Sequence, residues 1–320
     1  MIKVLQATPA PPIVAPPALC RRIADFMSQA SIEATRPSAA EVQELGAILP
    51  AGAEVYLTAL PNRDPMEIVE TAVAVRRAGL EPVPHVAARH HADLESIATL
   101  LKRLHGEAGV TCVMLIGGDM ATPLGSVRDA RQVIDSGVLQ DSGILEIGLP
   151  GFPDGHPVVG DDELECALVT KLAAAQSAGI DTHIVTQFCF EAEPVLNWLT
   201  RLRARGVNAP VRVGFAGPTS LMSWLSFARR CGVRASAETL AKRSGLIKQA
   251  FRSVSPDPQI RQVAEATLNG DWGEVASHIF SFGGIVSTAR WTVGPARGPI
   301  ELTADGFEVV GRPAPIRLKA

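Results

Sequence analysis

The 320-residue chain contains few cysteines, and no two of them are closely spaced. Its five cysteines are odd in number and form no C-x-x-C motif: Cys20, Cys112, Cys166, Cys189 and Cys231. Such a set supports neither a disulfide framework nor a thiolate zinc site. We therefore expect small core residues in a reducing cytoplasm.

Long apolar runs and an excess of basic residues are also missing. No stretch reaches the roughly 18 apolar residues that a membrane span requires, and prolines interrupt residues 1–20, where a secretory signal would have an apolar segment. The net charge is −3 and no dense stripe of lysine and arginine occurs, which argues against a nucleic-acid partner. With 47% apolar residues, the chain can bury a large core. We expect a soluble, cytoplasmic protein with a proline-rich arm in front.

Short apolar runs alternate with amphipathic helical patterns along most of the chain. The expected strands cover residues 30–35, 54–60, 81–87, 111–117, 143–149, 182–190, 211–217 and 277–283. Eight strands, of which all but the last are clearly followed by a helix, predict an α/β fold of the (β/α)₈ TIM-barrel type. The rival is a doubly wound open sheet, but no G-x-G-x-x-G motif opens its first helix.

Several segments extend this predicted barrel. We expect residues 1–320 to form a single catalytic domain with a core of about 30–295, preceded by an arm and helix in 1–29 and followed by an extension in 296–320. Residues 299–311 read as a hairpin around Asp305-Gly306. Between strands seven and eight, 237–252 and 258–271 read as extra helices.

Polar residues collect where the predicted strands end. In such barrels the active site lies at the carboxyl ends of the strands. The residues there are Glu33, Thr35, Thr58, His85, Gly117, Gly118, Asp119 and Gln187, and strand five runs into a turn with Asp154 and His156. These positions are therefore candidates for the site.

Glu33 is the most informative of these residues. It alternates with Ile32 and Ala34, so if Ile32 faces the helices, Glu33 points to the barrel axis. Desolvation there raises the pKa of a carboxyl group, which keeps it protonated for general acid catalysis near neutral pH. An alternative is a glutamate neutralised by a lysine or arginine of the barrel.

The other polar residues each have a structural interpretation as well. Asp119 follows two glycines and could cap the next helix. His85 and His156 could be structural histidines, and His90-His91 would face solvent at a helix start. Gln187 lies in an apolar run, so its amide needs a hydrogen-bond partner. No H-E-x-x-H or G-x-S-x-G motif supports metal-dependent hydrolysis or serine-type acyl transfer.

In their order along the chain, these residues resemble the methylenetetrahydrofolate reductase family. The matching pieces are SIEATRP (31–37), LTA in strand two, PHVAA (84–88), LIGGD (115–119), FPDGHP (152–157), AGIDTHIVTQFCFE (178–191) and VGFAGP in strand seven. They span about 31–283. The T-Q-F-x-F core and the aspartate after strand four are the more specific signals.

The resemblance implies reduction of 5,10-methylenetetrahydrofolate to 5-methyltetrahydrofolate through FAD, with NADH or NADPH as electron donor. Glu33 matches the general acid, Asp119 the acidic residue beside flavin and pterin, and Gln187 the pterin-binding amide. The implied cofactor contacts are Thr58, His85, Gly117, Gly118, Asp119, Phe152 and His156. Because no histidine/carboxylate triplet stands at ligand spacing, we expect no metal site. We also expect a homo-oligomer in which the arm or the hairpin serves the interface.

This chain departs from the family pattern on the cofactor side. Gly117 replaces a frequent arginine, Phe152 an aromatic hydroxyl, and Ala173-Ala174-Ala175 a basic cluster. Lower flavin affinity or another electron donor would follow. Two alternatives remain open: a flavin-free reductase that uses NAD(P)H directly, and a non-redox folate-binding partner of a methyltransferase. The pathway, methionine biosynthesis or one-carbon catabolism, also stays open.

Overall fold

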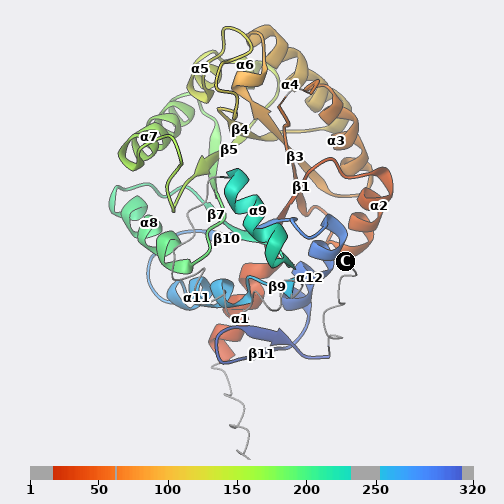
Figure 1. The fold of residues 1–320 in the computed structure, drawn as a ribbon. Helices are drawn as coiled ribbons and strands as arrows, with labels where there is room; N and C mark the ends of the chain where they lie inside the picture. Colours follow the sequence, from red (N-terminus) through yellow and green to blue (C-terminus); the bar gives the residue numbers. More distant parts are fainter. Residues whose placement is uncertain (1–16, 62, 232–252, 312–320) are drawn as a thin grey trace, which may run out of the picture.

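Eight parallel strands close into a barrel (Figure 1). The computed structural model describes residues 17–61, 63–231 and 253–311. Around the barrel the strands follow the order β1-β10-β7-β6-β5-β4-β3-β2. Their bounds are β1 (Ser31–Ala34), β2 (Glu54–Leu57), β3 (Glu81–Ala87), β4 (Cys112–Ile116), β5 (Glu146–Gly151), β6 (Asp181–Thr186), β7 (Val211–Ala216) and β10 (Val275–Phe280). The predicted TIM barrel is thereby confirmed.

Helices surround the strands. They are α1 (Pro17–Ser28), α2 (Ala39–Ile48), α3 (Glu67–Arg77), α4 (Leu94–Ala108), α5 (Ala130–Asp135), α6 (Val138–Asp141), α7 (Asp161–Ser177), α8 (Ala192–Ala204), α11 (Asp257–Ala266) and α12 (Ile285–Arg297). Capping boxes start α2 at Ser38 and α4 at Asp93, which explains where these two helices begin. Across the described ranges, no helix is both long and apolar enough to cross a membrane.

Strand alternation divides each strand between the outer core and the barrel interior. Ile32 and Val55 are neighbours in register, are fully buried and belong to the large core between strands and helices. Glu33 and Tyr56 are the next pair in register, so they lie on the opposite, inward face. The expected direction of Glu33 is thus explained by the pairing of β1 with β2.

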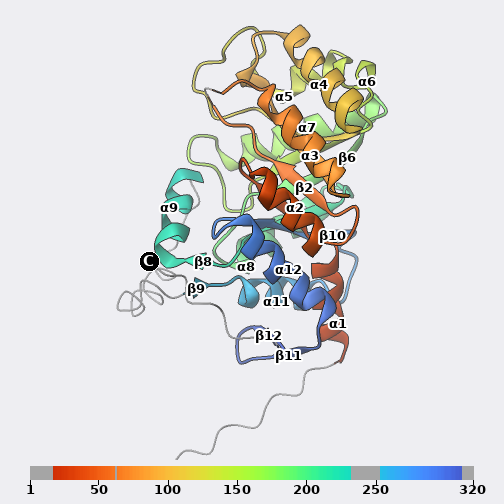
Figure 2. The same cartoon turned by 90° about the vertical axis from the view of Figure 1, so that its right-hand side faces the viewer.

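The segments added to the barrel lie mainly between β7 and β10. Helix α9 (Leu221–Cys231) lies over the carboxyl ends of the strands, in front of the barrel in Figure 1 and at one side of it in Figure 2. The short strands β8 (Thr219–Ser220) and β9 (Ser253–Val254) pair antiparallel. The helical pattern of 258–271 is confirmed as α11, while that of 237–252 lies outside the described residues.

Two further expectations concern strand ends. The predicted C-terminal hairpin is present as β11 (Ile300–Leu302) and β12 (Phe307–Val309). Strand six, however, ends at Thr186, so the prediction of a strand through residue 190 was wrong. Phe188 and Phe190 leave the sheet and pack in a separate aromatic cluster, because the chain turns away where the barrel ends.

Candidate active site

Glu33 lies near the carboxyl end of β1 and is the central residue of the site. Its side chain is 17% exposed, which leaves the carboxyl reachable from the barrel mouth. Burial raises the pKa of this carboxyl group above its ordinary value, and nearby His85 opposes part of the rise. Among the described residues, no lysine or arginine forms an ion pair with Glu33; Arg212 of the barrel pairs with Glu54 instead.

Two histidines face the Glu33 carboxyl group. Its Oε2 atom lies 3.6 Å from Nε2 of His85 and 3.7 Å from Nε2 of His278. Burial lowers the pKa of His85, and it lowers the pKa of His278 to about 3, where Arg212 and His183 add to the effect. Both imidazoles are therefore neutral at pH 7, and both Nε2 atoms lack a hydrogen-bond partner within the described structure. The site thus holds an acid that neutral groups surround.

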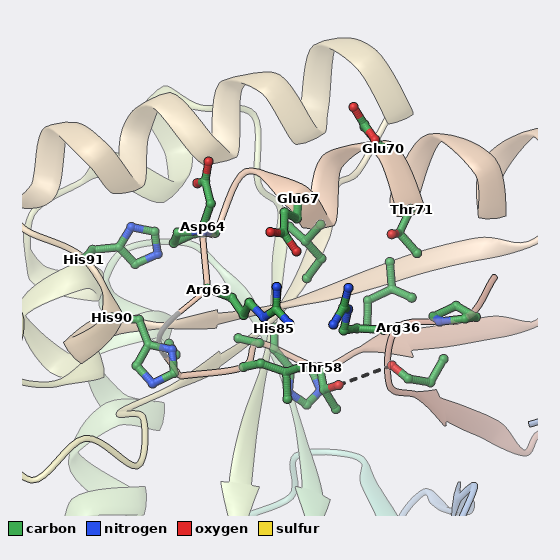
Figure 3. A pocket seen from close by; sticks show the side chains of 18 of the residues that line it. Arg36, Thr58, Arg63, Asp64, Glu67, Glu70, Thr71, His85, His90 and His91 are labelled. Carbon is green, nitrogen blue, oxygen red and sulfur yellow. Dashed lines mark hydrogen bonds between the residues drawn. The ribbon is translucent and has the colours of Figure 1, made fainter. Parts of the chain in front are cut away.

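A cavity of about 460 Å³ opens over the carboxyl ends of β2 and β3; Ala34 and His85 line it, whereas Glu33 does not. Figure 3 shows Arg36 and Arg63 directed into it above Thr58 and His85, with His90 and His91 at one side. The Thr58 hydroxyl donates to Oγ1 of Thr35 at 3.0 Å. We call this cavity, together with Asp119, the polar side of the mouth. Its volume is that of a small-molecule site.

Asp119 follows β4 and is held by a histidine. Its side chain is 68% exposed, and Oδ1 lies 2.9 Å from Nε2 of the buried His90. Gly118 has φ 95°, and a Cβ atom there would lie 3.1 Å from the His90 ring, so glycine permits this close approach. Asp119 caps none of the described helices; Asp129 caps α5. The capping interpretation was therefore wrong.

Gln187 lies one residue beyond β6, outside the polar cavity. Its Oε1 accepts the backbone N–H of Phe188 at 3.1 Å, which gives the amide one of its partners. The adjacent residues form what we call the aromatic side of the mouth: Phe188, Phe190, Trp224, Phe280 and Phe282, with Leu221. Gln187 therefore lies beside the aromatic side and not in the polar cavity.

The structure distributes the remaining expected cofactor contacts unevenly. Thr58 and His85 line the polar cavity, and Gly117 accepts the N–H of Arg89 with its carbonyl at 2.9 Å. Phe152 and His156 follow β5 and form an edge-to-face ring pair with centroids 5.3 Å apart. His156 Nδ1 accepts the N–H groups of Val158 and Val159, so this ring orders its own turn.

Sequence reasoning missed several residues of the site. His90 and His91 are buried, so the expectation that they face solvent was wrong; burial, with His90 adding to the effect, lowers the pKa of His91 to about 4. His278 could have been found from the alternation of β10, where it separates Ser277 from Ile279. Arg36 and Arg63 follow the ends of strands one and two, the level at which the other candidates were sought.

Another group of polar residues lies at the opposite, amino end of the barrel. One potential metal-ligand atom from each of three side chains lies within 4.8 Å of the other two, and these side chains are Cys112, Glu146 and His183. His183 nevertheless contacts Glu146 at 2.6 Å through Nδ1 and the Tyr56 hydroxyl at 2.7 Å through Nε2. Burial also raises the pKa of the Cys112 thiol well above its ordinary value. Because both ring nitrogens are engaged and the thiol keeps its proton, we assign no metal role.

The fold and the site define a (β/α)₈ barrel whose candidate active site lies at the carboxyl ends of its strands. The family model of methylenetetrahydrofolate reductase matches residues 34–260. This match covers more than half of the chain, and the chain therefore belongs to the methylenetetrahydrofolate reductase family. It includes Thr58, His85, Asp119 and Gln187, and it begins one residue after Glu33.

One curated relative and two solved structures extend the comparison. Methylenetetrahydrofolate reductase 1 of Schizosaccharomyces pombe is 28% identical over 148 residues, and the match covers 42% of this chain and 22% of that protein. The chain thus covers about a fifth of this relative's length.

The solved structures are more distant. Dihydropteroate synthase (FolP) from Thermus thermophilus has a TM-score of 0.44 and 14% identity, with 82% of this chain and 89% of that chain covered. A putative lyase/mutase from Burkholderia cenocepacia J2315 has a TM-score of 0.45 and 12% identity, with 87% and 85% covered. At these values neither likeness supports an argument about function.

Proposed function

We propose that this protein reduces 5,10-methylenetetrahydrofolate to 5-methyltetrahydrofolate, with Glu33 as general acid. The observation that carries the proposal is a buried carboxyl group without a cationic partner among the described residues, flanked by two neutral imidazoles at the mouth of the barrel. Such surroundings favour the protonated acid. Family membership supplies the substrate class.

In this proposal, Glu33 donates its proton to N10 of the folate. The five-membered ring then opens to an iminium cation, and hydride transfer to the one-carbon unit gives the methyl group. General acid catalysis of this kind contributes about 10²–10⁴-fold to a rate. The neutral state of His85 and His278 matters because a cationic imidazole would lower the pKa of Glu33 and remove the proton at neutral pH.

Asp119 and Gln187 have supporting roles in the proposal. The carboxylate of Asp119, which His90 orients, supplies negative charge toward the cation formed on the folate. Gln187 has amide N–H groups that would hydrogen-bond the pterin, and the partly buried rings of Phe280 and Phe282 are the ones on the aromatic side that could contact a bicyclic ligand. Glu33 lies between these regions, since Phe280 is its neighbour in register and His85 contacts its carboxyl group.

The residues of the polar side fit the ring system of a flavin. Thr58, His85, Gly118 and Asp119 gather polar groups and a glycine around one part of the mouth, and we propose them as flavin contacts. The flavin, FAD in this proposal, would accept electrons from NADH or NADPH and supply hydride.

The second candidate is a flavin-free reductase that uses the nicotinamide directly. It is favoured by the last turns of α7, where Ala173-Ala174-Ala175 offer no cation. The nearest lysine on that helix is Lys171, whose pKa burial lowers. These alanines stand where the family resemblance implies basic contacts to the cofactor.

An assay with methylenetetrahydrofolate and NAD(P)H, with and without added FAD, tests both candidates. Product formation that depends on FAD, together with flavin absorbance in the visible spectrum, supports the first candidate. Product formation by a colourless protein supports the second. Folate binding without product under any donor condition contradicts both and favours the non-redox folate-binding partner.

A further inference from the structure

We propose that Arg36 and Arg63 bind the diphosphate of a dinucleotide in the polar cavity. Arg36 follows β1 and Arg63 follows β2, and Figure 3 shows both guanidinium groups directed into the cavity from these two loops. The inference rests on the proposed function for the reaction served, and it concerns where the electron-carrying ligand is held. FAD and NAD(P)H share this diphosphate chemistry.

Both arginines lack a partner. Within the described ranges, neither Arg36 nor Arg63 forms an ion pair with a carboxylate, although Asp64, Glu67 and Glu70 also line the cavity. The Asp64 carboxylate accepts the N–H of Met66 at 2.9 Å, and Figure 3 shows Asp64 and Glu70 directed away from the arginines. Two planar guanidinium groups therefore remain available to an anion, and phosphate suits their paired N–H donors.

The polar cavity carries charges of both signs. Glu67, at the start of α3, is directed toward the arginines in Figure 3. A simple polyanion would be repelled by this carboxylate, whereas a dinucleotide carries ribose hydroxyl groups that donate to carboxylates as well as phosphates that need cations. The combination of Arg36, Arg63 and Glu67 thus matches a sugar diphosphate better than it matches an isolated phosphate group.

The cavity lies close to the proposed general acid. It is lined by Thr58 and His85, and His85 contacts the proposed general acid Glu33. A dinucleotide anchored by the arginines can therefore place its reactive ring beside His85 and near Glu33. The cations missing from α7 are supplied in this arrangement by the loops after β1 and β2.

Calorimetric titration of the 320-residue chain with pyrophosphate, ADP, FAD and NADH tests the inference. We expect Arg36→Met and Arg63→Met each to weaken binding of pyrophosphate and ADP by about tenfold, and the double variant by about 100-fold, as for the loss of one or two charge-assisted contacts. Higher salt should weaken binding to the wild type far more than to the double variant. Arg77→Met, an exposed arginine at the opposite end of α3, is the matched control and should leave all affinities unchanged.

Glu67→Gln separates the ribose contact from the phosphate contact. It should weaken ADP binding while leaving pyrophosphate binding equal or stronger, because pyrophosphate has no hydroxyl donors and loses a repulsive carboxylate. The titrations with FAD and NADH identify the natural ligand of the cavity, since the arginine substitutions should lower the affinity for the dinucleotide that binds there. Unchanged secondary structure by circular dichroism verifies that each variant is folded.

The outcomes distinguish this inference from the proposed function. If the double variant binds ADP, FAD and NADH with wild-type affinity, or the wild type binds none of the four probes, the inference is wrong even when folate reduction is observed. If ADP binding depends on the arginines but no folate is reduced under any condition, the proposed function is wrong and the cavity assignment stands.

Discussion

The polar side and the aromatic side of the mouth are built from different loops and differ in how their side chains are held. The polar side, over β2 to β4, carries exposed arginines and the exposed Asp119 around a 460 Å³ cavity. On the aromatic side, Phe188, Phe190 and Trp224 are buried, and Phe188 contacts three other rings. We infer that the polar side contributes mainly to binding and the aromatic side mainly to stability.

Glu33 lies where the two sides meet, and its replacement should have the largest effect. Glu33→Gln keeps the shape of the side chain but removes the acid, so folate reduction should slow by about 10²–10⁴-fold. The rate of NAD(P)H-driven flavin reduction, measured as the loss of flavin absorbance, should be unchanged. Glu95→Gln, on the exposed first turn of α4, is the control. Equal damage to both half-reactions would contradict the role of general acid.

On the aromatic side, Phe188→Ala should destabilise the fold strongly. Phe188 is fully buried, and truncation of such a ring costs about 3–5 kcal/mol because it leaves a cavity. Phe188→Leu should cost less, since most of the volume remains. Urea unfolding measures both, and Arg36→Met on the polar side should stay within about 0.5 kcal/mol of wild type. Comparable losses for Phe188→Ala and Arg36→Met would remove the distinction between the sides.

His278 contributes a pH dependence from inside the barrel. Its folded pKa of about 3 lies below the unfolded value of about 6.5, so its neutral form stabilises the fold above pH 6.5, and that stability is lost as pH falls toward 3. Between pH 7 and pH 5, protonation of His278 in the unfolded state should lower the free energy of unfolding by about 2 kcal/mol. His278→Gln should lose correspondingly less unfolding free energy over the same interval. Parallel pH curves for variant and wild type would contradict this interpretation.

The smallest effect is expected at the His90–Asp119 contact. Because Asp119 is 68% exposed, loss of the contact in His90→Leu should cost less than about 1 kcal/mol of stability. Folate reduction should fall by less than tenfold, since the carboxylate remains but is less well oriented. Steady-state kinetics with Asp119→Asn alongside tests this: if His90→Leu lowers kcat more than Asp119→Asn does, His90 has a role beyond orientation.

Much of the fold could be predicted from sequence, and the site only in part. The order of strands and helices follows from local apolar patterns, and alternation around Ile32 gave the direction of Glu33. The end of strand six at Thr186 and the burial of His90 were missed, because both depend on packing between segments distant in sequence. Arg36 and Arg63 carried no local signal that distinguished them from surface arginines.

The sequence by itself determined the barrel, because the strands and helices carry their own periodicity, and it indicated most of the polar residues that follow the strands. The tertiary structure decided which of them meet. Closure of the barrel pairs β10 with β1 and so brings His278 to Glu33, and the loops after β3 and β4 bring His90 to Asp119. These contacts set desolvation and charge, which no single segment can specify, since they depend on every chain segment that surrounds the group.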